Sequence, residues 1–268
     1  MPVYWFALSQ LVHINLPKAI LIFIILHMLV YPSSNGYNSY MDRDEGPIGG
    51  IKNPLAPTRQ LFYVSVIMDF IAILVSGLIS SQFTIGILVY ILASRAYSYR
   101  GIRVKKYPIW GYLLVCACQG ALVFYLVYSG STQNLTYSTP LLPAVASSFL
   151  IGGFYPLTQI YQHKSDKEDG VTTISFLLGY RGTFIFTGIV YAISFVMLGF
   201  TFFYNLEWLQ FMVLQILMLP VIVYFFIWMR KVWKDETEAN FKNTMKMNVI
   251  ASSFTNLGFI TVLIINQF

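Results

Sequence analysis

Residues 206–229, LEWLQFMVLQILMLPVIVYFFIWM, decide the fold class of this chain. Glu207 is the only charged residue in this stretch, and a helix of about 20 apolar residues is long enough to cross the hydrocarbon of a bilayer. Similar apolar runs lie at 18–34, 61–80, 82–96, 109–129, 139–157, 183–203 and 246–266. Residues 2–11 form about half a span. The sequence therefore predicts an all-α, polytopic transmembrane bundle of about nine helices, forming a single domain over residues 1–268.

The composition excludes a water-soluble protein. The chain is 57% hydrophobic and only 10% charged, whereas soluble domains have about 25% charged residues. So few charges cannot cover a surface that faces water. We therefore expect the surface of the protein to contact the lipid bilayer, and we expect no nucleic-acid partner.

The basic residues indicate how the chain is oriented in the membrane. Sixteen of the 17 lie in four alternate predicted loops or at their edges, and only Lys18 lies on the other side. Loops rich in Lys and Arg stay in the cytoplasm. We expect an integral protein of a bacterial inner (plasma) membrane, with cytoplasmic loops at 35–60, 97–108, 162–182 and 231–245.

Six of the 11 acidic residues fall in two clusters, at 38–45 and 162–169, each at the predicted cytoplasmic end of an apolar helix. Residues four apart share a helix face, so Asn38 projects with Asp42 and Gln162 with Asp166. Such oxygen ligands suit Mg²⁺, which completes its shell with water and substrate phosphate. Nearby cations would neutralise that phosphate; they are Lys52, Arg59, Arg103, Lys105 and Lys106.

The alternative is that these acids are only solvated loop residues. The amide-x-x-x-Asp spacing recurs in both clusters, which argues against that interpretation. By contrast, we interpret Asp235, Glu236 and Glu238 in the last predicted cytoplasmic loop as solvated.

These residues resemble the signatures of the UbiA superfamily of intramembrane prenyltransferases. Its first signature, Asn-x-x-x-Asp-x-x-x-Asp, is matched by Asn38, Asp42 and the following Arg43. The second, Asp-x-x-x-Asp with a later Gly, Thr and Leu-Leu-Gly, is matched in register by Gln162, Asp166 and the residues Gly170, Thr173 and 177–179. A Tyr-x-x-x-Lys element resembles Tyr99-x-x-x-Arg103, with Lys105 just beyond.

Three features depart from the family pattern. The third acid of the first signature is Gly46, and the first acid of the second is Gln162. Asp44, Glu45, Glu168 and Asp169 are available only out of register. Three alternatives to the usual two tightly bound Mg²⁺ ions therefore stay open: weaker metal binding, a single ion, or a different chemistry. Only 37 residues precede Asn38, so we also expect a first helix that is truncated.

The resemblance implies a Mg²⁺-dependent transfer of an isoprenyl group from an isoprenyl diphosphate to a hydrophobic or aromatic acceptor, at the cytoplasmic face. It implies Asn38, Asp42, Gln162 and Asp166 as metal ligands. Arg43, Lys52, Arg103 and Lys105 would bind the diphosphate. Asp42, Asp166 and Tyr99 would be the catalytic residues, with Tyr99 contacting the diphosphate or the developing cation.

Two other functions stay open. One is a terpene cyclase on the same fold. The other is a non-catalytic or transport protein, which Asp69 in the middle of an apolar span would suit, because intramembrane charges mark functional sites. A neutral or hydrogen-bonded packing carboxyl is an equally good interpretation of Asp69. His27 is a possible partner for it, but the sequence favours a buried imidazole with its own hydrogen bonds. Cys116 and Cys118 are expected to be packing residues, and residues 134–136 match a glycosylation sequon.

Overall fold

A computed structural model describes residues 1–43, 46–47, 50–132 and 140–267. Asp44, Glu45 and the sequon at 134–136 lie outside these described residues. The α-helices are α1 (Pro2–Ser9), α2 (Leu16–Ile24), α3 (Tyr31–Asp42), α4 (Arg59–Ser76), α5 (Ser81–Ser98), α6 (Pro108–Cys116), α7 (Val123–Gly130), α8 (Leu141–Gln159), α9 (His163–Glu168), α10 (Ile174–Tyr204), α11 (Trp208–Lys234) and α12 (Phe241–Gln267). Two π-helical segments, η1 (Ile25–Val30) and η3 (Ala117–Leu122), join α2 to α3 and α6 to α7. Short 3₁₀ segments are η2 (Val104–Lys106), η4 (Ile160–Gln162) and η5 (Glu236–Glu238).

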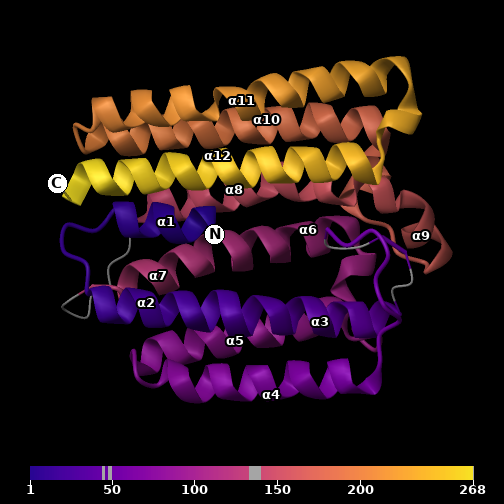
Figure 1. Ribbon diagram of the computed structural model, residues 1–268, viewed down its shortest axis with the longest axis horizontal. Coiled ribbons are helices and arrows are strands. Elements are labelled where there is room, and N and C mark those ends of the chain that lie inside the picture. The colour runs from indigo at the N-terminus through magenta and orange to yellow at the C-terminus, as the bar shows by residue number, and fades with distance from the viewer. Residues whose placement is uncertain (44–45, 48–49, 133–139, 268) are drawn as a thin grey trace.

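The helices form a bundle whose members run along one common axis (Figure 1). In the described part of the chain they make nine passes, counting α2–η1–α3 and α6–η3–α7 as one each. Seven of these are long and apolar enough to span a membrane; α1 is too short, and α5 carries polar residues that include Arg95. The predicted all-α transmembrane bundle is confirmed.

The helices of the bundle fall into three groups (Figure 1). Helices α2 to α5 lie at one edge and α10 to α12 at the other, with α6 to α8 between them. This arrangement brings α3, α5, α6 and α8 together around the bundle interior, where the polar residues described below are found.

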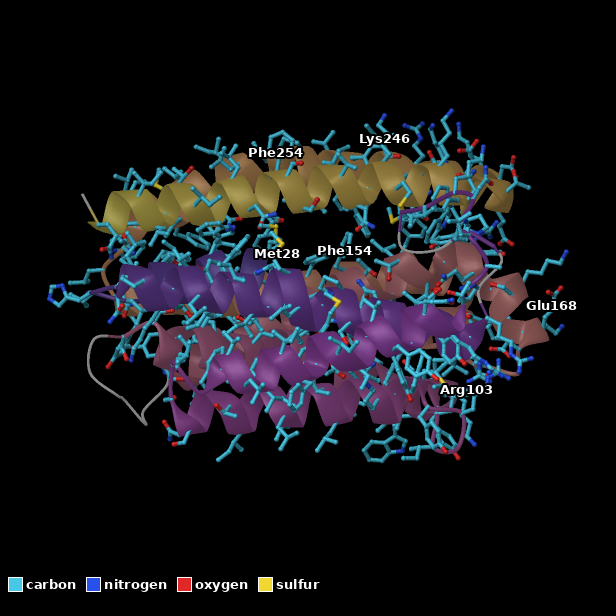
Figure 2. The ribbon with its side chains drawn as sticks, turned by 60° about the horizontal axis from the view of Figure 1, so that its bottom comes forward. Met28, Arg103, Phe154, Glu168, Lys246 and Phe254 are labelled. Carbon is cyan, nitrogen blue, oxygen red and sulfur yellow. The ribbon has the colours of Figure 1, made fainter. Side chains whose placement is uncertain are left out.

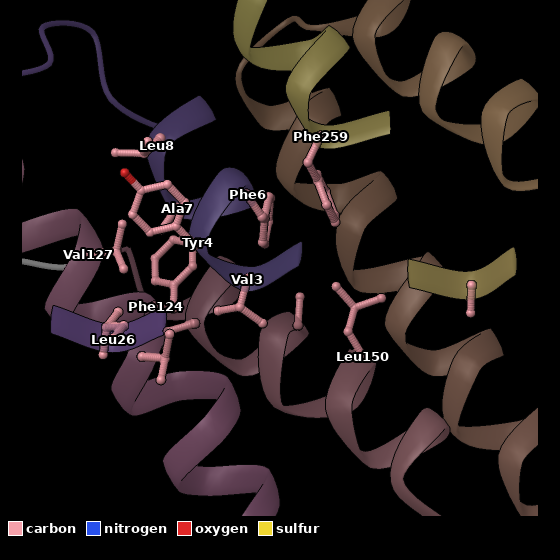
Figure 3. Close-up of a cluster of buried hydrophobic side chains, with 14 of the residues drawn as sticks. Val3, Tyr4, Phe6, Ala7, Leu8, Leu26, Phe124, Val127, Leu150 and Phe259 are labelled. Carbon is pink, nitrogen blue, oxygen red and sulfur yellow. The ribbon is translucent and has the colours of Figure 1, made fainter. Parts of the chain in front are cut away.

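The short helix α1 is a buried element between α7 and α12 (Figure 3). Phe6 is fully buried and stacks on Phe259 of α12, with 4.7 Å between ring centroids. Tyr4 donates a hydrogen bond from its hydroxyl to the carbonyl of Ala19 in α2, at 2.8 Å. At eight residues and 1.5 Å per residue, α1 covers only part of the bundle length.

Several helices extend beyond the predicted spans, so the predicted loops were too long. Helix α3 continues to Asp42, α9 forms within the predicted loop at 162–182, and α10 begins at Ile174. Hydropathy locates where a chain leaves the hydrocarbon, whereas a helix ends where its backbone hydrogen bonds are capped. Gly179 bends α10 near its start through a positive φ of 68°, a conformation that glycine adopts without strain.

Most of the described charged residues gather at one end of the bundle, as the distribution of basic residues among the loops predicted. Arg103, Glu168 and Lys246 lie toward this end in Figure 2. The prediction for Arg95 was wrong: it was counted with the basic residues of the loop at 97–108, but it lies within α5, where it forms an ion pair with Asp69 of α4. A buried carboxylate on a neighbouring helix explains this position, since charges inside membrane proteins are normally paired.

Candidate functional site

The first acidic cluster lies on the last turn of α3. Asn38 and Asp42 are one turn apart on this helix, which stops at Asp42 because Arg43 takes the left-handed conformation, with φ 57°. The Asn38 carboxamide oxygen accepts a hydrogen bond of 2.7 Å from the Ser98 hydroxyl at the end of α5. This bond fixes the Asn38 side chain against the neighbouring helix.

Two cations from the α5–α6 connection bind this cluster. Lys105 forms an ion pair with Asp42, and an Arg103 Nη lies 3.4 Å from the same carboxylate. Arg103 also pairs with Asp169, beyond α9. The Arg103 and Lys105 side chains are only 11% and 10% exposed, so water screens these pairs weakly.

The second cluster lies where α8 gives way to η4 and α9. Gln162 ends η4 and Asp166 lies on α9. Thr173 donates a hydrogen bond to the Asp166 carboxylate at 3.4 Å and caps the first turn of α10 by accepting from the Phe176 amide. Gly170, with φ 67°, makes the turn between these two helices.

Both clusters open into one cavity of about 650 Å³, which we call the outer chamber. Among its lining residues are six of those predicted for the site: Asn38, Asp42, Arg43, Lys105, Gln162 and Asp166. Arg103 adjoins the chamber through its ion pairs with Asp42 and Asp169. Its buried Nε finds no acceptor among the described residues, so it is a free donor beside the carboxylates.

Besides Arg103, two predicted residues do not line the outer chamber. Tyr99 caps the end of α5, is 49% exposed, and packs over Gly101. Lys52 is exposed in the α3–α4 connection. Their predicted roles receive no support from this geometry and stay predictions.

A second cavity of about 250 Å³, the inner chamber, continues from the outer one into the bundle. Five lining residues belong to both chambers: Asn38, Tyr97, Gln159, Tyr161 and Gln162. A third cavity of about 260 Å³ borders the inner chamber through Ser34, Asn35, Tyr90 and Gln119.

Tyr97, Tyr155 and Gln159, near the junction of the chambers, were not predicted from the sequence. The Tyr97 hydroxyl hydrogen-bonds the Tyr155 hydroxyl, and the Gln159 carboxamide donates to Tyr155 at 2.9 Å. Gln159 lies three residues before Gln162, a spacing that keeps both on one helical face. That spacing was a usable signal, whereas nothing in the sequence favoured Tyr97 over Tyr99.

The outer chamber suits a metal ion that also binds a substrate phosphate. In the described ranges no three His, Cys, Asp or Glu side chains come together as a metal centre. Two carboxylates, Asp42 and Asp166, and two amides, Asn38 and Gln162, do line the chamber. Mg²⁺ requires few protein ligands when phosphate and water supply the rest, so this donor set fits Mg²⁺ with an anionic substrate.

Asp69 is not part of either chamber. It is buried, pairs with Arg95, and accepts a 2.5 Å hydrogen bond from Ser33 of α3. Arg95 also donates to Ser33 at 2.8 Å and lies 3.9 Å from the ring centre of Tyr37. The pair therefore ties α4 and α5 to the helix that carries Asn38 and Asp42. His27 instead hydrogen-bonds the Phe23 carbonyl at 3.1 Å.

Comparison with known proteins gives a family match over most of the chain. The sequence pattern of the UbiA prenyltransferase family matches residues 1–250. A search of curated proteins gave no match.

Solved structures resemble the fold over nearly the whole chain. A UbiA homolog from Aeropyrum pernix K1 superposes with a TM-score of 0.73 at 16% identity, covering 97% of this chain and 95% of that one. A UbiA homolog from Archaeoglobus fulgidus, bound to DMAPP and Mg²⁺, gives 0.66 at 18%, with coverages of 98% and 93%. A digeranylgeranylglyceryl phosphate synthase gives 0.63 at 18%, with coverages of 98% and 91%.

Proposed function

Because this chain belongs to the UbiA prenyltransferase family, we propose that it transfers an isoprenyl group from an isoprenyl diphosphate to a hydrophobic or aromatic acceptor within the membrane. The observation that carries the proposal is the outer chamber. It joins carboxylates from α3 and α9 to cations from the α5–α6 connection at the charged end of the bundle.

Mg²⁺ would be held by Asn38, Asp42, Gln162 and Asp166. When bound, it would neutralise charge on the diphosphate and help it leave. The Archaeoglobus fulgidus homolog, bound to Mg²⁺ with DMAPP or GPP, supports this assignment by likeness of fold.

The diphosphate would be bound by Arg43, Lys52, Arg103 and Lys105. Arg103 is the best supported of these, because its buried Nε is an unused donor next to the chamber. Lys105 pairs with Asp42 in the structure, and a diphosphate would offer it a second anion. Fixed cations of this kind stabilise the negative charge that grows on the leaving group.

The reaction requires the bond between C1 of the isoprenyl group and the diphosphate oxygen to break, with the electron pair leaving on the diphosphate. The acceptor then supplies an electron pair to C1 and loses a proton. Tyr97 and Tyr155 stand at the junction of the two chambers, where their aromatic faces would stabilise the allylic cation. The surrounding bundle would keep bulk water from capturing that cation.

A terpene cyclase is the second candidate, because the same chamber would ionise the same diphosphate. The inner chamber favours a transferase, since it supplies room for a separate acceptor beside the outer chamber. We place the outer chamber on the cytoplasmic face of a bacterial inner membrane, on the positive-inside argument. Tyr99→Cys and Ser165→Cys, both at exposed positions, should then react with an impermeant thiol reagent from the cytoplasmic side only.

The test is diphosphate release by the purified protein in detergent, with Mg²⁺ and an isoprenyl diphosphate, with and without an aromatic acceptor. Asp42→Asn should abolish release. The matched control is Glu236→Gln, at an exposed carboxylate outside both chambers that lies 3.5 Å from Arg181. Release that depends on acceptor supports the transferase, and release with a cyclic product and no acceptor supports the cyclase. Full activity of Asp42→Asn would refute both.

A further inference from the structure

The two chambers differ sharply in charge. The outer chamber is lined by seven charged residues: Asp42, Arg43, Lys105, Lys164, Asp166, Glu168 and Asp169. Among the described residues that line the inner chamber there are amides, hydroxyls and phenols but no charged side chain. This difference in charge suggests that the two chambers have different roles in the reaction.

The inner chamber lies deep in the bundle. Gln119 lines the inner chamber and belongs to the π-helical segment η3. It lies eleven residues after Pro108, the first residue of α6. At 1.5 Å per residue this is roughly 17 Å along the helix, near the middle of a bilayer. π-Helical turns inside α-helices frequently occur at functional sites, because they redirect a side chain.

Several polar groups in this chamber have no protein partner. Gln159 is 6% exposed, and its carboxamide oxygen has no hydrogen-bond donor among the described residues. Asn35 also lines the chamber and is exposed. Its side chain likewise makes no hydrogen bond within the described part of the chain. Gln119 is exposed on the wall of this chamber.

This chemistry disfavours two kinds of occupant. A hydrocarbon tail would cover these amides without forming hydrogen bonds to them, which is unfavourable for buried polar groups. A carboxylate or phosphate would find no cation in the chamber to balance its charge. A neutral molecule with hydroxyl groups would meet both requirements, since its hydroxyls can donate to free carboxamide oxygens and accept from amide NH₂ groups.

We infer that the inner chamber binds the prenyl acceptor, and that this acceptor is a compact, neutral, hydroxyl-bearing ring compound. The inference rests on the proposed function. One hydroxyl donates to the Gln159 oxygen at the junction, which brings the ring to the outer chamber where C1 of the donor is held. Gln119 and Asn35 bind the polar groups at the far end. A chamber of about 250 Å³ lies just under the ~300 Å³ of the smaller drug-sized pockets, so it holds a single substituted ring.

The test uses two probes of similar size, 4-hydroxybenzyl alcohol, which is neutral, and 4-hydroxybenzoate, which carries a carboxylate in place of the alcohol. Their binding is measured by equilibrium dialysis against the full chain in lipid nanodiscs, with Mg²⁺ and an isoprenyl diphosphate present. The neutral probe should bind about tenfold more tightly than the carboxylate. Gln119→Leu and Asn35→Leu should each weaken the neutral probe by up to about tenfold, the value of one hydrogen bond.

Gln215→Leu is the matched control, because it removes an intramembrane amide on α11 that lines neither chamber. It should leave the binding of both probes unchanged. Equal or tighter binding of the carboxylate, no saturable binding of either probe, or equal affinities in Gln119→Leu, Asn35→Leu and the control would overturn the inference. Failure of the proposed function is seen separately, as the absence of Mg²⁺-dependent binding of dimethylallyl diphosphate to the unchanged protein.

Discussion

The Asp69–Arg95 pair should stabilise the bundle and fix the site helix α3. The perturbation is Arg95→Met, which keeps an unbranched apolar stem and removes the guanidinium with its charge. Asp69 then keeps a carboxylate that is only 12% exposed and has lost its cation. Ser33 loses the 2.8 Å hydrogen bond that Arg95 donates to it.

The magnitude follows from burial. Removing one partner of a buried ion pair costs about 3–5 kcal/mol, mainly because the other charge is left uncompensated. The Arg95 side chain is 17% exposed, so residual solvation places the expected cost near 3 kcal/mol. Replacing both partners, as Asp69→Leu with Arg95→Met, should recover much of this loss, because no buried charge remains.

The assay is reversible unfolding in mixed detergent micelles, run on both single variants and on the double variant as a cycle. The same proteins are titrated with Mg²⁺, since a shifted α3 should weaken the metal site. Asp235→Asn, at a fully exposed carboxylate of the α11–α12 connection, is the control. Single losses below about 1 kcal/mol that simply add in the double variant would refute the reasoning.

Three further outcomes are expected. Asp42→Ala and Asp166→Ala should each abolish Mg²⁺-dependent diphosphate release. The double variant should lose little more activity than either single variant, because both carboxylates act on one bound ion. Losses of activity that multiply in the double variant would disprove a shared ion. Gln162→Asp adds a carboxylate to the outer chamber, so the Mg²⁺ concentration for half-maximal release should fall, and an unchanged value would count against Gln162 as a ligand. Gly120→Ala should destabilise the bundle by about 1–3 kcal/mol, because an added Cβ would come within 2.4 Å of the Ser148 backbone, and an unaltered unfolding curve would contradict this packing.

The site was predictable in part. The acids and amides at 38–42 and 162–166 were found because helical spacing repeats in both clusters, and the structure brings both to one chamber. Lys105 and Arg103 were found because cations follow the apolar span of α5. Tyr99 was predicted because it resembles the Tyr-x-x-x-Lys element of the family. The α5 helix ends at Ser98, however, which leaves Tyr99 half-exposed and Tyr97 on the chamber wall.

The sequence by itself determined the fold class, the number of helical passes and the end of the bundle that carries the charge. These follow from local hydropathy, because hydrocarbon excludes charged groups and requires each spanning segment to satisfy its own backbone. Only the tertiary structure decided that Arg95 pairs with Asp69 and that Gln159, Asn35 and Gln119 share a neutral chamber. Such contacts join helices far apart in the chain, and local pattern does not say which faces of two helices meet.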